Sequence, residues 1–139
     1  MRTFIFACIH NAGRSQMSAA LFNLYADGDQ ARAISAGTQP ADGVHPVVLE
    51  AMREVGIDLS SARPQKLTAE MAEGAEMLIT MGCGEECPYI PGLRRDDWPL
   101  PDPKGQGIEA VRHTREEIRR RVLALLEAEA LLTKNAAEA

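Results

Sequence analysis

The chain has 139 residues, of which 45% are apolar and 25% are charged, a length and composition that fit one globular domain and exclude a disordered or fibrous chain. Its 15 basic and 20 acidic residues give a formal charge of −5, which argues against a general nucleic-acid binder, and no window approaches the ~20 consecutive apolar residues of a membrane span. Three cysteines are an odd number for a disulfide framework, and the N-terminal residues lack the long apolar segment of a secretory signal, so we expect a cytoplasmic protein.

Two short apolar runs in the first half of the chain predict buried strands, one over residues 3–7 and one over residues 31–36. The segment between them places apolar side chains at helical spacing and predicts a helix from residue 14 to about residue 27. Its stripe consists of Met17, Leu21 and Leu24. A second helix is predicted between Pro46 and Gly56, two residues that favour a helix start and a helix end. Its stripe consists of Val48, Ala51, Met52 and Val55.

The second half of the chain contains a third apolar run, over residues 77–81, which predicts another buried strand. Residues 83–107 hold five of the eight prolines, so we expect mostly loop there, with one short strand over residues 94–98. A last helix is predicted by apolar residues seven apart on one face, and the tail after residue 134 is expected to fray. That face consists of Val111, Ile118, Leu125 and Leu132, with Val122 between them. The outer face is expected to be solvated surface and consists of Arg115, Glu116, Arg119 and Arg120.

This alternation of strands and helices predicts an α/β fold with a single domain over residues 1–139. We expect a parallel four-stranded sheet that is flanked by helices on both faces. In such sheets, ligands bind beyond the carboxyl ends of the strands, where the strand order reverses. The turn between the first strand and the first helix is therefore the first place to look for chemistry.

That turn, over residues 8–15, has the sequence Cys-Ile-His-Asn-Ala-Gly-Arg-Ser. A loop this short can curl around one tetrahedral oxyanion, with its backbone N–H groups and the following helix N-terminus pointing at the anion. Arg14 adds a planar fork of donors that matches two oxyanion oxygens. The same positive surroundings stabilise a thiolate, so Cys8 is a candidate nucleophile. The candidate substrate-binding residues are Ile9, His10, Asn11, Ala12, Gly13, Arg14 and Ser15.

A purely structural role is the alternative interpretation for these residues. A Cys8 that only ends a buried strand is the alternative to a nucleophile, because free cysteine is among the most buried residue types. The spacing of Gly13, Arg14 and Ser15 after it favours the nucleophile. Asn11 tolerates left-handed backbone geometry and can serve to shape the loop. His10 is expected to be a loop residue, because a thiolate stabilised in this way needs no base.

The run CIHNAGRSQM, residues 8–17, resembles the phosphate loop of low-molecular-weight protein-tyrosine phosphatases, and within that superfamily it is most similar to thioredoxin-coupled arsenate reductases. The resemblance continues in residues 35–37, 56–60, 81–88 and 97–103. The Cys-x5-Arg-Ser loop is typical of the superfamily, and the pair Cys83 and Cys87 distinguishes reductase from phosphatase. The resemblance implies a flavodoxin-like topology and the reduction of arsenate to arsenite for arsenic detoxification. It also implies thioredoxin as the electron donor, with no bound cofactor.

Cys83 and Cys87 lie four residues apart after the third predicted strand. An extended segment of this length spans up to ~14 Å, but the Cα atoms of a disulfide lie about 5.5–6 Å apart, so the segment must turn, and Gly84 allows a turn. A zinc half-site and two inert thiols are the alternatives, although a full zinc site needs four ligands. The resemblance implies a relay in which Cys8 acts first, Cys83 second, and Cys87 last as the most exposed thiol.

Asp102 precedes Pro103, and its simplest role is that of a turn former. The resemblance implies that Asp102 is the general acid that protonates the leaving oxygen. It also implies that Ser15 hydrogen-bonds the sulfur of Cys8, while Trp98 is expected to pack the loop. Some relatives bind potassium near the phosphate loop through an Asp after the second helix. Residues 60–66 offer Lys66 in place of that acid, so we expect no bound metal.

Two other functions stay open at this stage. A protein-tyrosine phosphatase would need Cys8, Arg14 and Asp102 but not the Cys83–Cys87 pair. Against it, the loop lacks the second cysteine that such phosphatases usually have, and Gln16 stands where many have proline. A non-catalytic module that senses anions or binds metal through thiols is the other alternative. The reductant is expected to be thioredoxin, or a small thiol with a glutaredoxin-like partner, and the protein is expected to be a monomer.

Overall fold

The computed structural model describes residues 1–82 and 90–133. Its elements follow in the order β1 (Arg2–Cys8), α1 (Arg14–Tyr25), β2 (Ala31–Gly37), α2 (Pro46–Arg53), α3 (Ala69–Glu73), β3 (Met77–Thr80), β4 (Arg94–Asp97) and α4 (Ile108–Ala128). The predicted strands and helices are confirmed in this order, and the tail expected to fray lies outside the described residues. No helix within the described ranges is long and apolar enough to cross a membrane.

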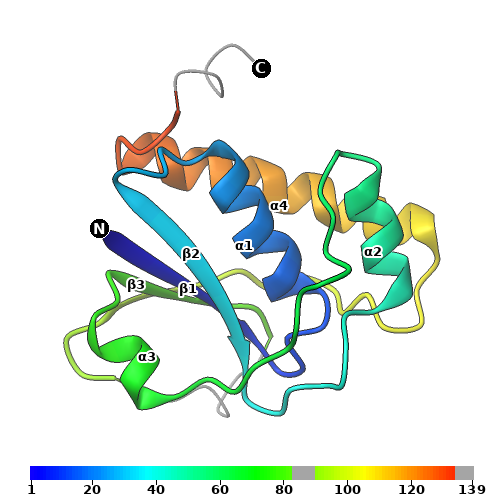
Figure 1. Cartoon of the computed structure of the whole chain (residues 1–139), viewed down its shortest axis with the longest axis horizontal. Coiled ribbons are helices and arrows are strands. Elements are labelled where there is room, and N and C mark those ends of the chain that lie inside the picture. The colour runs from blue at the N-terminus through cyan, green and yellow to red at the C-terminus, as the bar shows by residue number, and fades with distance from the viewer. Residues whose placement is uncertain (83–89, 134–139) are drawn as a thin grey trace.

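The four strands form one parallel sheet in the order β2-β1-β3-β4, which confirms the predicted fold class (Figure 1). Phe4 of the central strand β1 pairs with Ala33 of β2 on one side and with Met77 of β3 on the other. The chain thus leaves β1 toward one edge of the sheet and later returns on its other side. The strand order reverses at β1, so the end of this strand at Cys8 is where such a sheet binds its ligands.

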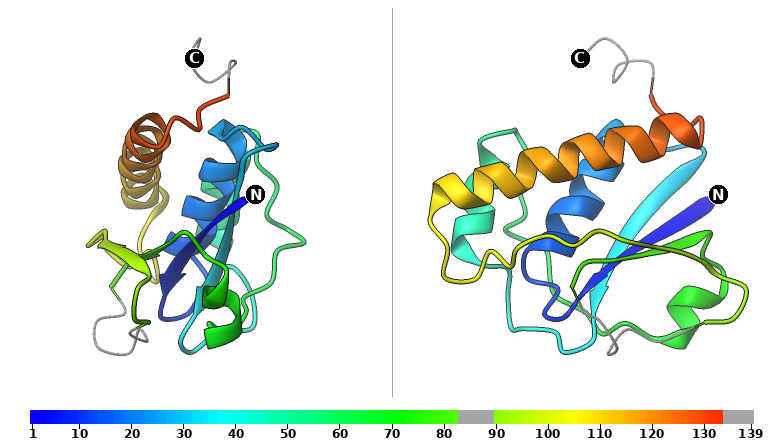
Figure 2. Two further views of the ribbon diagram at one scale, coloured as in Figure 1. Left: turned by 90° about the vertical axis from the view of Figure 1, so that its left-hand side faces the viewer. Right: turned by 180° about the vertical axis from the view of Figure 1, so that it is seen from behind.

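Helices cover both faces of this sheet, as predicted (Figure 2). Alternate residues of β1 point to opposite faces. Phe4, Phe6 and Cys8 belong to the core cluster shared with α1, α2 and α4. Ile5 and Ala7 belong to a smaller cluster on the other face, where α3 packs. Both faces of β1 are therefore buried, which explains its continuous apolar sequence.

The buried face of α4 differs from the predicted one. The predicted residues are seven apart, but an α-helix has 3.6 residues per turn, so a strict seven-residue repeat drifts about 20° per heptad. As a consequence Leu126 is fully buried in place of Leu125, and Leu132 lies beyond the end of the helix in a bridge to Ala26. The buried residues of α4 are Val111, Thr114, Ile118, Val122 and Leu126.

Two shorter helices also depart from their predicted stripes at their ends. In α1, Leu24 is 49% exposed and Phe22 is fully buried in its place, in contact with the rings of Phe4 and Phe6. The helix α2 ends at Arg53, so Val55 follows it and is 38% exposed. Terminal residues of a stripe are the least constrained because the chain leaves the core there.

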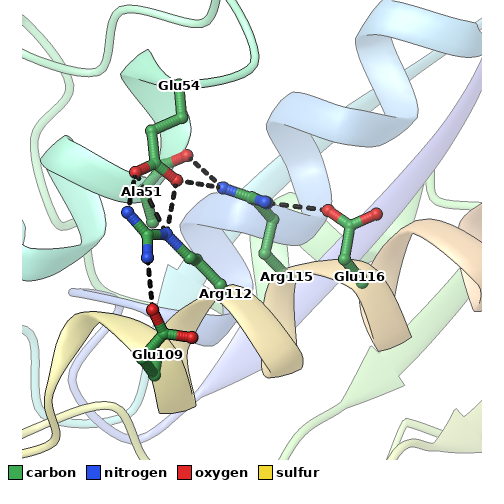
Figure 3. A network of polar contacts seen from close by, with 6 residues as sticks. All are labelled: Ala51, Glu54, Glu109, Arg112, Arg115 and Glu116. Carbon is green, nitrogen blue, oxygen red and sulfur yellow. Dashed lines mark hydrogen bonds and ion pairs between the residues drawn. The ribbon is translucent and has the colours of Figure 1, made fainter.

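The outer face of α4 is not the simple solvated surface that the sequence predicts (Figure 3). The side chain of Arg115 is only 12% exposed; it donates to the Ala51 carbonyl at 2.8 Å and to Glu54 at 2.7 Å. Arg112 also pairs with Glu54, at 2.6 Å. These contacts join α4 to α2, and α2 begins beside the loop that follows β1. Charged residues on this face thus stabilise the packing of two helices.

The sheet ends in a charged edge strand. All four residues of β4, Arg94–Asp97, are exposed, and charged side chains on an edge strand discourage pairing with other chains. The short helix α3 has no counterpart in the prediction, because five residues are too few to show a helical repeat. It is capped by Thr68, whose side chain accepts a hydrogen bond from the Met71 N–H group.

Candidate active site

The loop after β1 turns its backbone carbonyl groups away from its centre. Amides of the segment after β2 donate to three of these carbonyls, and Gln16 Nε2 donates to a fourth, that of Asn11. The three backbone pairs are Gln39 to Ile9 at 2.8 Å, Ala41 to His10 at 2.9 Å and His45 to Ala12 at 2.9 Å. The N–H of a trans peptide points opposite to its C=O, so the N–H groups of residues 10–13 point into the loop. The loop is therefore built as a cradle for an anion.

Gly37 at the end of β2 permits this arrangement. A Cβ atom at this position would lie 2.6 Å from the Ile9 carbonyl oxygen and 2.9 Å from the Asn11 nitrogen. Such distances exclude any side chain unless the backbone moves. The close approach of β2 to the loop explains the glycine that closes this strand.

The N-terminus of α1 completes the cradle. Gly13 is the N-cap, no side chain caps the helix there, and its first turn contains no acidic residue. The first N–H groups of a helix lack intrahelical partners and carry partial positive charge. An oxyanion beyond Gly13 would therefore meet free N–H donors and the positive end of the helix dipole.

The predicted nucleophile lies at the base of this cradle. Cys8 is buried, and its Sγ lies 2.9 Å from Ser15 Oγ, as the resemblance implies. Asn11 is also buried; it has a left-handed backbone, with φ of 51°, and its Nδ2 donates to Ser15 Oγ at 2.7 Å. Asn11 thus shapes the loop, as predicted, and it also orients Ser15.

Arg14 brings three segments of the chain together. Its guanidinium is buried, donates from Nη1 to the Leu100 carbonyl at 3.1 Å, and places Nη2 3.8 Å from Asp102 Oδ2. The same group packs against Gly82, where a Cβ atom would lie 2.5 Å from Nη1. The segment that leads into Cys83 therefore lies against Arg14, at the end of β3.

The two carboxylate oxygens of Asp102 have different partners. Its Oδ1 accepts the Lys104 N–H at 3.0 Å, which is the contact of a turn former, and Oδ2 faces Arg14. The Asp102 side chain is 45% exposed, so it is accessible to solvent. The neighbouring Pro103 is buried against Gly13, which fixes the loop over the cradle.

His45 is a site residue that the sequence analysis missed. Its ring lies beside Gly13, where a Cβ atom would be 3.5 Å from His45 Cδ2, and it precedes α2 as the N-cap. Burial lowers the pKa of His45, and the Asp102 carboxylate opposes this shift, while electrostatic interactions with His10, Lys104 and Arg14 lower the pKa further. Only the topology, which returns the chain from β2 to the loop, reveals this position.

His10 and Trp98 agree with their predicted roles. The Nδ1 atom of His10 lies 3.1 Å from the Gln39 carbonyl, in an exposed contact outside the cradle, which fits a loop residue. Trp98 is 4% exposed and packs against Phe6 with ring centroids 5.4 Å apart. Trp98 is therefore a packing residue.

The surroundings of Asn11 do not fit a potassium ion. Its Oδ1 accepts hydrogen bonds from Gln16 Nε2 at 3.2 Å and from the Gln65 N–H at 3.0 Å, while Gln65 Nε2 donates to the Ser35 carbonyl at 2.8 Å. These oxygens already have N–H donors, which a cation would have to displace. Gln65 thus provides N–H donors to both the Asn11 and the Ser35 oxygens, next to Lys66.

Cys83 and Cys87 lie outside the described residues, so their roles in a relay or in a zinc half-site stay predictions. Within residues 1–82 and 90–133, no three His, Cys, Asp or Glu side chains come together in a way that could hold a metal ion.

Comparison with known proteins gives a consistent result over nearly the whole chain. The sequence pattern of the family described as low molecular weight phosphotyrosine protein phosphatase matches residues 3–137. A putative arsenate reductase of Halobacterium salinarum is 38% identical over 128 residues, which are 89% of this chain and 90% of that protein.

Two solved structures resemble the fold closely. The thioredoxin-dependent arsenate reductase of Corynebacterium glutamicum has a TM-score of 0.79 and 39% identity; the match covers 92% of this chain and 61% of that one. A structure of an arsenate reductase in the oxidized state has a TM-score of 0.80 and 30% identity, and the match covers 92% of this chain and 98% of that one.

Proposed function

The chain belongs to the low molecular weight phosphotyrosine protein phosphatase family, and we propose that it is an arsenate reductase with Cys8 as its nucleophile. The observation that carries this proposal is the position of the Cys8 sulfur, 2.9 Å from Ser15 Oγ at the base of the cradle. A tetrahedral oxyanion held by the inward N–H groups and by Arg14 would present its central atom to this sulfur. Arsenate is the oxyanion named in the similar proteins.

In the first step the Cys8 thiolate attacks arsenic. A bond forms between Sγ and arsenic, one As–O bond breaks, and the leaving oxygen takes a proton from Asp102 and departs as water. Arsenic stays pentavalent in this adduct. The contact between Arg14 and Asp102, at 3.8 Å, supports the assignment because it holds the acid beside the anion-binding guanidinium.

In the second step the Cys83 thiolate attacks the sulfur of Cys8. The bond between Cys8 and arsenic breaks, its electron pair goes to arsenic, and trivalent arsenite leaves while a disulfide forms between Cys8 and Cys83. The position of Gly82 supports this step, because Gly82 packs against Arg14 and consecutive Cα atoms lie ~3.8 Å apart. Cys83 follows Gly82 directly in the sequence.

In the last steps Cys87 attacks Cys83, releases the Cys8 thiolate and leaves a disulfide between Cys83 and Cys87. A dithiol protein then returns this disulfide to two thiols by supplying two electrons and two protons. We propose thioredoxin as this partner, in keeping with the similar thioredoxin-dependent enzyme. The enzyme would act as a monomer in the cytoplasm, where thiols stay reduced, and would serve arsenic detoxification without a bound cofactor.

A phosphatase activity is the second candidate. The Cys8 sulfur contacts Ser15 and the Arg14 guanidinium faces Asp102, an arrangement that a phosphatase also needs. Hydrolysis of p-nitrophenyl phosphate without any reductant would support this alternative. The activity would have to survive the loss of both Cys83 and Cys87.

The test of the proposal is arsenate-dependent consumption of NADPH by the purified protein with thioredoxin and thioredoxin reductase. We expect consumption that needs all three proteins and that stops in the Cys8→Ser variant, in which the cradle and Arg14 remain. Consumption by Cys8→Ser would contradict the assignment of the nucleophile. The Arg14→Lys variant should also fail, because a point charge cannot replace the bidentate guanidinium.

A further inference from the structure

Gln16 is a buried polar side chain that the proposed reaction does not use. It lies in the first turn of α1 and is only 6% exposed. Its Nε2 donates to the Asn11 carbonyl at 3.1 Å and to Asn11 Oδ1 at 3.2 Å. Both of these hydrogen bonds end on Asn11, so the Gln16 amide constrains this one residue, and its loss would remove the donor to the Asn11 carbonyl.

The orientation of the Asn11 amide follows from its partners. The backbone N–H of Gln65 can only donate, and it lies 3.0 Å from one side-chain atom of Asn11, which must therefore be the oxygen Oδ1. The Asn11 nitrogen Nδ2 then faces Ser15 Oγ, at 2.7 Å, and donates to it. Since Ser15 Oγ accepts this bond, its own hydrogen is free for the sulfur of Cys8, at 2.9 Å.

We propose that Gln16 is a positioning residue that holds the Asn11 amide in the orientation in which Ser15 donates its hydroxyl hydrogen to Cys8. The chain of contacts runs from Gln16 through Asn11 and Ser15 to the sulfur, and all four side chains are buried. In surroundings shielded from water, the direction of each hydrogen bond sets the direction of the next. The inference rests on the proposed function only in taking Cys8 as the reactive thiol.

The substitution Gln16→Glu reverses the chain of hydrogen bonds. A carboxylate cannot donate, so it repels Oδ1 of Asn11 and attracts Nδ2, which favours rotation of the Asn11 amide. Ser15 would then donate to Asn11 Oδ1, and Cys8 would lose the hydrogen bond that stabilises its thiolate. The substitution Gln16→Met keeps the length of the side chain but removes the donor, while the Gln65 N–H still holds Asn11.

The experiment follows alkylation of Cys8 by iodoacetamide from pH 5 to pH 10, with the Cys8 peptide identified by mass spectrometry. We expect Gln16→Glu to slow alkylation near neutral pH by roughly tenfold or more, the range of one hydrogen bond to a charged group. Gln16→Met should have a smaller effect. All rates should converge at high pH, where the thiol is ionised without help, which a purely structural loss would not produce.

The matched control is Gln30→Glu, which adds the same charge at an exposed position between α1 and β2. It should leave the alkylation profile unchanged. A folded Gln16→Glu protein with the wild-type profile would overturn the proposal, and if that variant does not fold, a wild-type profile for Gln16→Met would overturn it. This test needs no arsenate, so its failure is distinct from a failure of arsenate reduction in the wild type.

Discussion

Pro103 packs so closely on Gly13 that a Cβ atom built on Gly13 would lie 2.4 Å from Pro103 Cγ. This contact joins the loop that carries Asp102 to the N-cap of α1, where the anion would bind. The position of Asp102 therefore depends on Gly13. This glycine positions the Asp102 loop as well as the N-terminus of α1.

The first prediction concerns this contact. Gly13→Ala should push Pro103 away and move Asp102 from the cradle, and a displacement of about 1 Å can cost roughly 100-fold in rate. We expect a loss of this order in arsenate turnover while the far-UV circular dichroism stays unchanged. Steady-state NADPH consumption measures the effect.

Two further variants make this test specific. The double variant Gly13→Ala with Pro103→Ala removes the colliding ring atoms and should recover part of the lost rate. Gly28→Ala is the control, because no atom lies within 4 Å of the added methyl group. Equal losses in the single and the double variant would show that the contact with Pro103 is not the cause.

The second prediction separates the two roles of Asp102. Asp102→Asn keeps an acceptor for the Lys104 N–H and removes the proton donor, so formation of the Cys8–arsenic adduct should slow by roughly 10²–10⁴-fold. Rapid-quench measurement of a single turnover reports this step directly. A rate within a few-fold of the wild type would make Asp102 a turn former alone, and Pro103→Ala would then be the more damaging change. Asp42→Asn, at an exposed position in the segment between β2 and α2, is the control.

The third prediction concerns the pH dependence that His45 produces. Burial lowers the pKa of His45 below 6.5, so the unfolded chain takes up this proton at higher pH than the folded protein does. The contribution of His45 to the free energy of unfolding is therefore fully present above about pH 6.5, and it decreases as the pH falls below this value. His45→Gln should remove this part of the pH dependence, as urea unfolding between pH 5 and pH 8 would show. An imidazole NMR titration with a midpoint at or above 6.5 in the folded protein would contradict the argument.

Much of the fold was predictable because β1 and β3 are largely buried and apolar and β2 exposes only Arg32, so these strands have no regular polar face to confuse the pattern. The loop was predictable because Cys8, Gly13 and Arg14 all lie in one short continuous stretch of the sequence. The buried position of Leu126 in place of Leu125 was not, since the predicted seven-residue repeat differs from the true helical period. The helix α3 is too short to show any repeat.

The site residues that the sequence analysis did not predict come from parts of the chain that are distant in sequence from the loop after β1. His45, Gln65 and Leu100 reach the loop through backbone contacts or packing that no local pattern encodes. Arg115 was predicted to be solvated because arginine usually is, but its contact with the Ala51 carbonyl depends on how α2 crosses α4. Such contacts become visible only when the elements are assembled.

The fourth prediction concerns the network between α2 and α4 (Figure 3). Hydrogen bonds from Arg112 and Arg115 lower the pKa of Glu54 to about 2. The carboxylate therefore stabilises the fold fully above its unfolded pKa of 4.5, and this stabilisation is lost as the pH falls from 4.5 toward 2. Glu54→Gln should be less stable than the wild type at pH 7, and the difference should shrink by pH 3. Glu50→Gln, exposed on the same helix, should show no such difference in urea unfolding.

The fifth prediction concerns the place where the disulfide accumulates. After arsenate treatment without reductant, the wild type should carry one disulfide between Cys83 and Cys87, with Cys8 returned to a free thiol. Cys87→Ser should stop one step earlier, with Cys8 joined to Cys83 and no more than about one turnover per chain. Peptide mapping by mass spectrometry distinguishes the two pairings.

The pairing of Cys8 with Cys83 requires the segment after β3 to approach the phosphate loop, and Gly82 is placed for this. Its φ of 83° lies in the left-handed region that favours glycine, and a side chain there would collide with Arg14. Gly82→Ala should therefore impair both anion binding and the formation of this disulfide, whereas Gly74→Ala, with open space around the added methyl group, should impair neither. Normal turnover of Cys87→Ser with thioredoxin would show that the third thiol is dispensable. The adduct on Cys8 would then be resolved by an external small thiol.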